Sequence, residues 1–153
     1  MKKTVCFLTV IILLFSLSSC RREENAYELI SEFVELYRAE GVIYSPTLPE
    51  GSVGYIDDSV FFKIYLYYGD APKNYAVFLN SHIDTSSECG AFVCLGESER
   101  AAALEACSER IRLLTGADSG GLIITSSNIV FYSTMSDKEF TESCWKSVLR
   151  SHS

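Results

Sequence analysis

The stretch GAFVCLGESERAAALEACSERIRLLTG, residues 90–116, decides the fold, because an apolar run turns directly into a long helical pattern. Residues 90–95 are short, apolar and bounded by turn residues, which is typical of a buried strand. Residues 97–115 predict an amphipathic helix that Gly116 ends. Its core-facing stripe is expected to consist of apolar residues at three- and four-residue steps: Leu104, Cys107, Ile111 and Leu114.

The residues after this helix predict a hairpin and a last helix. Two β-branched runs, 122–125 and 129–133, flank a short polar turn, which indicates a β-hairpin. The tetrapeptide SDKE that starts at Ser136 is a capping box and predicts the start of a helix. Gly120 and Gly121 precede a strand and have no lysine nearby, so they indicate a turn rather than a phosphate-binding loop.

The residues before the strand–helix unit are less uniform. A helix is predicted from residue 26 to about residue 40, with Asn25 as its cap and Gly41 at its end. Residues 42–58 read as a loop with one short strand, and residues 75–79 read as a buried strand. Residues 59–68 have strand-like composition, but helix-bounding residues flank them, so both assignments stay open on periodicity.

This order of elements predicts an α+β fold in which helices pack on a small, mainly antiparallel sheet. Residues 26–151 are expected to form one domain. This length is sufficient for a hydrophobic core that needs no metal or disulfide to be stable.

The N-terminus has the features of an export signal. Lys2 and Lys3 precede thirteen mostly apolar residues, 5–17, which are too few to span a bilayer but suit a signal peptide. The segment LSSC that ends at Cys20 resembles the lipobox of bacterial lipoproteins. This resemblance implies a signal peptide over residues 1–19, a diacylglyceryl group on Cys20 and a short tether over residues 20–25.

Such a chain is expected on the outer face of the cell membrane, held there by two acyl chains. Arg21 and Arg22 can then meet lipid headgroups. Without Lys2 and Lys3, the 13 basic residues fall to 11 against 20 acidic ones, and this acidic balance argues against a nucleic-acid partner.

A looser resemblance covers residues 55–150. The segment YAVFL, an acidic Glu88 before GAFVCL, a helix led by Ser98 and the pair Arg110-Ile111 resemble small uncharacterised lipoproteins of Gram-positive anaerobes. The resemblance implies a short helix before YAVFL, and we therefore assign residues 59–68 to a helix. Cys89 and Gly90 depart from the aliphatic residues expected after Glu88. The family implies a fold and a location but no activity.

Four cysteines remain once Cys6 leaves with the signal and Cys20 carries lipid. Outside the cytoplasm they can form two disulfides, or they can stay free as small buried hydrophobes, which we favour. Their spacing does not fit a zinc site. The four are Cys89, Cys94, Cys107 and Cys144.

The segment NSHIDTSSEC contains the strongest candidates for chemistry: His82, Asp84, Glu88 and Cys89. A cysteine with a nearby histidine can act as a nucleophile, and such a cluster can bind a metal. The same residues are common in polar loops, which we favour, so no catalytic centre, metal or cofactor is expected.

Seven tyrosines are dense for a domain of this size: Tyr44, Tyr55, Tyr65, Tyr67, Tyr68, Tyr75 and Tyr132. They either cap the edge of the core, the commoner role, or form a contact surface for a protein or glycan. The candidate binding residues are Tyr65, Tyr67, Tyr68 and Tyr132. The sequence thus predicts a membrane-anchored, non-catalytic binding or envelope-assembly module. The alternative is an extracytoplasmic enzyme or metal-binding protein that uses the region from His82 to Cys89.

Overall fold

The computed structural model describes residues 24–65, 67, 72, 74–81, 87–116 and 120–152. The signal peptide, the lipobox and Cys20 therefore lie outside the described residues. In the described part, helices and strands follow one another in this order: α2 (Ala26–Tyr37), β1 (Gly41–Tyr44), α3 (Asp58–Tyr65), β2 (Asn74–Asn80), β3 (Glu88–Val93), α4 (Glu97–Thr115), β4 (Leu122–Ser126), β5 (Ile129–Ser133) and α5 (Lys138–Ser151).

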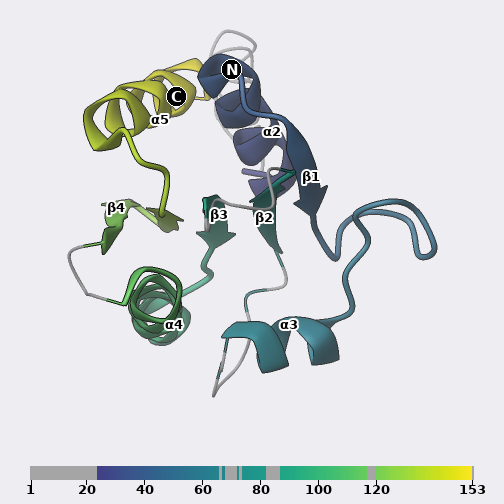
Figure 1. Cartoon of the computed structure of the whole chain (residues 1–153). Coiled ribbons are helices and arrows are strands. Elements are labelled where there is room, and N and C mark those ends of the chain that lie inside the picture. Colours follow the sequence, from purple (N-terminus) through teal and green to yellow (C-terminus); the bar gives the residue numbers. More distant parts are fainter. Residues whose placement is uncertain are drawn as a thin grey trace, which may run out of the picture.

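The strands form one five-stranded sheet in the order β1-β2-β3-β5-β4, with every neighbouring pair antiparallel. Helices α2 and α5 cover one face of this sheet, and α3 and α4 cover the other (Figure 1). The predicted α+β class is confirmed, as a three-layer arrangement with the sheet in the middle.

Each face of the sheet has its own apolar core. On the α2 and α5 face, Trp145 stacks on Phe131 with ring centroids 4.0 Å apart. On the other face, Phe61 stacks on Tyr75 with centroids 3.9 Å apart. Consecutive residues of a strand point to opposite faces, so β3, buried at every position, serves both cores. Cys89 faces α2 and α5, whereas Glu88 faces α3 and α4.

Most predicted elements are confirmed, with corrections at their ends. The first helix ends at Tyr37, not near residue 40, because Arg38 takes the left-handed conformation (φ 60°) that terminates it, and Gly41 begins β1. The helix assigned to residues 59–68 is present as α3. The last helix is capped by Asp137 rather than Ser136, because the Asp137 carboxylate accepts a hydrogen bond from the Phe140 amide.

Helix α4 has the predicted bounds, but its buried face is rotated relative to the predicted stripe. Cys107 and Ile111 are buried as expected. Leu104 is only partly buried, and the small residues Ala103 and Ala106 lie against the sheet instead. Among the described residues, no helix is long and apolar enough to cross a membrane.

Candidate functional site

A buried carboxylate lies at the start of β3. Glu88 is 3% exposed and faces the layer of α3 and α4. Burying a carboxylate is costly unless charged or hydrogen-bonding partners replace water. The residues around Glu88 supply those partners from three other elements.

Arg110 of α4 is the charged partner of Glu88. Its Nε donates to Glu88 Oε1 at 2.8 Å and its Nη2 donates to Oε2 at 2.7 Å. This two-point contact matches the planar shapes of both groups. The hydrogen bonds to Glu88 raise the pKa of the Arg110 guanidinium, which therefore stays charged. The guanidinium carbon also lies 5.3 Å from the centre of the Tyr65 ring, a cation–π contact.

Two tyrosines complete the cluster. Tyr132 of β5 donates its hydroxyl to Glu88 Oε1 at 2.5 Å, and the Tyr65 hydroxyl lies 2.5 Å from that of Tyr132. Burial is the largest cause that raises the pKa of both phenols, so both remain protonated and can donate. We call Tyr65, Glu88, Arg110 and Tyr132 the buried polar cluster.

The backbone of β3 leaves room for this cluster. Gly90 pairs with Tyr132 across the sheet, and a Cβ at Gly90 would lie 2.6 Å from Tyr132 Cε1. Only glycine therefore lets the Tyr132 ring lie over β3 and reach Glu88. This contact explains why position 90 holds glycine and not the aliphatic residue expected after Glu88.

The chemistry of the cluster is that of a closed network. Both carboxylate oxygens of Glu88 accept hydrogen bonds from protein groups, and the hydroxyls bond to each other or to Glu88. A general base needs an oxygen within reach of a substrate, and here the oxygens are engaged and buried. The arrangement is suited to joining α3, β3, α4 and β5 rather than to catalysis.

The three described candidate binding tyrosines have the commoner of the two roles expected of them, which is a place in the core and not on a contact surface. Tyr65, Tyr67 and Tyr132 are 3%, 6% and 0% exposed, so they belong to the core. Tyr68 lies outside the described residues. A tyrosine is favoured where its ring is buried and its hydroxyl reaches water. Here the rings of these tyrosines pack in the core between the sheet and helices α3 and α4, so the hydroxyls are buried as well.

Of the four residues considered for chemistry in the segment NSHIDTSSEC, the structure describes Glu88 and Cys89. Cys89 is fully buried on the opposite face of the sheet from Glu88, and burial raises the pKa of its thiol. His82 and Asp84 lie outside the described residues. All four cysteines from Cys89 to Cys144 are free and buried, as we favoured. Within the described ranges, no group of three His, Cys, Asp or Glu residues is placed to hold a metal.

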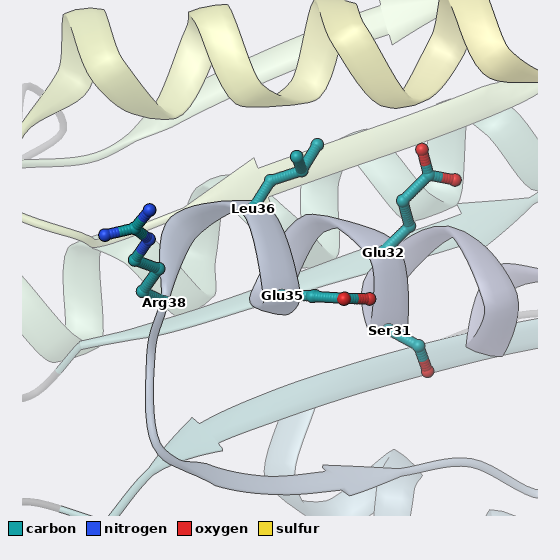
Figure 2. Close-up of a pocket in the computed structure, with 5 residues that line it drawn as sticks. All are labelled: Ser31, Glu32, Glu35, Leu36 and Arg38. Atoms are coloured by element: carbon teal, nitrogen blue, oxygen red, sulfur yellow. The ribbon is translucent and has the colours of Figure 1, made fainter.

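A shallow depression lies on the outer side of α2, lined by Ser31, Glu32, Glu35, Leu36 and Arg38. Figure 2 shows that all five side chains come from α2 and the residue that ends it. Glu32 is already engaged, because it accepts from the Ser151 hydroxyl at 2.7 Å and lies 2.9 Å from His152 Nε2. A depression lined by a single helix, in which the Glu32 carboxylate already has two partners, does not form a ligand-binding site.

Comparison with known proteins adds no assignment: the chain matches no family model, no curated protein and no solved structure. The resemblances to bacterial lipoproteins therefore stay predictions. Sequence reasoning missed the cluster because its residues come from distant parts of the chain. The available signal was Arg110, a charged residue at i+3 from Cys107 and beside Ile111 on an otherwise apolar face.

Proposed function

We propose that this chain is a lipid-anchored extracytoplasmic protein that acts as a non-catalytic binding or envelope-assembly module. The observation that carries the proposal is the segment LSSC ending at Cys20, preceded by a basic start and a short apolar run. The anchor confines the domain to the membrane surface and raises its effective concentration toward a protein or glycan partner there.

The described polar groups support the non-catalytic part of the proposal. The carboxylate of Glu88 is saturated by Arg110 and Tyr132. The thiols of Cys89 and Cys107 are buried with raised pKa, which opposes formation of the reactive thiolate. Neither set offers the combination of nucleophile, base and stabilising donor that enzymes bring together.

Metabolic labelling with a fatty-acid analogue tests the anchor. We expect Cys20→Ser to abolish label and to release the protein from membranes or leave it unprocessed. Cys6→Ser is the matched control, because it removes a thiol from the same leader without touching the lipobox. Label that persists in Cys20→Ser would disprove the lipid attachment.

Crosslinking and pull-down from native membranes tests the binding role. We expect a defined envelope partner with the wild-type chain and loss of that partner with the fraction of Cys20→Ser that is released from membranes, since the released protein is no longer confined. A partner retained equally by both forms would show that the anchor has no part in binding.

A further inference from the structure

The side chain of Asn74, the first residue of β2, holds the segment that enters α2. Its Oδ1 accepts from the Ala26 amide at 2.8 Å, and its Nδ2 donates to the Glu24 carbonyl at 2.6 Å. Asn25 lies between these two and caps α2 by accepting from the Tyr27 amide at 2.9 Å. Both ends of one amide are thus used to fix where the chain enters the domain. We call this contact the Asn74 clamp.

The segment that the Asn74 clamp holds lies close in sequence to Cys20, the residue proposed to carry lipid. Cys20 precedes Glu24 by four positions, so at most about 14 Å of extended chain joins them. A domain of this length is roughly 35 Å across. A tether shorter than the domain, leaving from a fixed point, restricts which end of the domain can face the bilayer.

The strand register defines what lies at that end. Asn74 pairs with Val93, and Val93 pairs with Ile129, so the start of β2, the end of β3 and the β4–β5 turn lie together. Leu95 follows Val93 by two residues and is 85% exposed. Its amide donates to Glu99 Oε2 at 2.8 Å, which holds this exposed leucine in place.

The charges around Leu95 indicate the kind of membrane contact. Glu97 and Glu99 open α4 beside it, and Arg100 lies 3.8 Å from Glu97. Net negative charge at this position disfavours attraction to anionic headgroups. The apolar side chain is therefore the group suited to contact lipid, at the boundary between headgroups and acyl chains.

We propose that the Asn74 clamp orients the domain so that the sheet end carrying Leu95 faces the bilayer and Leu95 contacts the lipid interface. This inference rests on the proposed lipid attachment at Cys20. Its consequence is that the opposite sheet end, where Ser133 leads towards α5, points away from the membrane and is the end presented to partners.

Accessibility of single probes on the lipidated full chain tests this orientation. Leu95→Cys and Ser136→Cys each place an exposed thiol for an environment-sensitive label, at opposite ends of the sheet. The native thiols at 89, 94, 107 and 144 are buried. In phosphatidylcholine vesicles we expect the label at position 95 to be several-fold less accessible to an aqueous quencher than the label at 136. Equal accessibility, or the reverse order, overturns the orientation.

Two further measurements separate the clamp from the anchor. Asn74→Ala, checked for its fold by circular dichroism, should keep its lipid but lose the protection at position 95; retained protection would overturn the role of the clamp. The mass of the N-terminal peptide reports lipid on Cys20 independently. If Cys20 carries no lipid, the proposed function and the orientation both fail. If it carries lipid and both probes are equally accessible, only the orientation fails.

Discussion

Glu88 and Arg110 form a buried ion pair. Their side chains are 4% and 19% exposed, so each guanidinium–carboxylate bond replaces water that burial removed. A buried ion pair contributes little net stability over an apolar pair of the same shape, but removing one partner strands the other charge. We infer that the pair acts mainly in specifying how α4 lies on the sheet.

Arg110→Ala should therefore lower the free energy of unfolding by about 3–5 kcal/mol, because it leaves the Glu88 carboxylate buried without its cation. Denaturant unfolding measures the change. The matched control is Lys146→Ala, which breaks a pair with Glu142 in which both side chains are well exposed; its cost should be below about 1 kcal/mol. Similar small losses for both variants would contradict the assignment of Arg110 to a buried ion pair.

Gly90→Ala should cost about 1–3 kcal/mol, because the added methyl group would collide with the Tyr132 ring over a close-packed sheet. The control is a double-mutant cycle with Tyr132→Leu, which removes the colliding ring atoms. We expect the cost of Gly90→Ala to shrink in that background, since the two residues are in contact. An unchanged cost would mean that the Ala76 carbonyl oxygen, 3.1 Å from the added Cβ, and not the Tyr132 ring, requires glycine at this position.

At the scale of elements, the local sequence pattern was sufficient to predict a helix or hairpin where a single strong signal, such as a terminating glycine or two β-branched runs, defined it. Helix α4 has its predicted bounds because Gly116 terminates it in the left-handed conformation (φ 73°), and the β4–β5 hairpin follows from its two β-branched runs. The rotation of α4 was not predictable from apolar spacing, because Arg110 must face Glu88 and draws the small alanines toward the sheet. Apolar spacing alone therefore predicted that Leu104 is fully buried, whereas it is only partly buried.

Truncations along α4 test this rotation. Ile111→Ala should destabilise the domain by about 2–5 kcal/mol, because Ile111 is 2% exposed and packs in the core. Leu104→Ala should cost clearly less, since Leu104 lies at the edge of the same core. Exposed Glu105→Ala serves as the control and should stay within about 0.5 kcal/mol. A loss for Leu104→Ala as large as that for Ile111→Ala, or larger, would contradict the rotation and favour the originally predicted stripe, in which both side chains face the core.

At the scale of the whole molecule, the buried polar cluster depends on topology that no local pattern contains. Its members come from α3, β3, α4 and β5, and the pairing of β3 with β5 across the intervening α4 and β4 brings them together. Sequence reasoning singled out Tyr65, Tyr132 and Glu88, but it left the tyrosines open between the edge of the core and a contact surface, and it favoured a loop for the glutamate. The residue types were informative, whereas their mutual placement required the sheet order.

The two cores contain several groups that burial keeps protonated, and these groups link stability to pH. Burial raises the pKa of the Tyr65 and Tyr132 phenols above the ordinary 10.0, and that of the Cys89 and Cys107 thiols above the ordinary 9.0. Above those ordinary values the unfolded chain loses protons that the folded domain retains. Stability from these groups is thus fully present below about pH 9 and is lost as pH rises further.

We therefore expect the thermal midpoint to fall progressively as pH rises above about 9, with the thiols contributing first and the phenols from about pH 10. Cys107→Ala should unfold at a lower temperature at neutral pH, because it leaves a small cavity, but should decline less steeply between about pH 8.5 and 10. Leu104→Ala is the control, since it removes core contact without removing a titrating group and should keep the wild-type slope. Scanning calorimetry across this pH range distinguishes the two variants. Identical slopes for Cys107→Ala and wild type would mean that the Cys107 thiol titrates equally in the folded and unfolded chains, contrary to its complete burial.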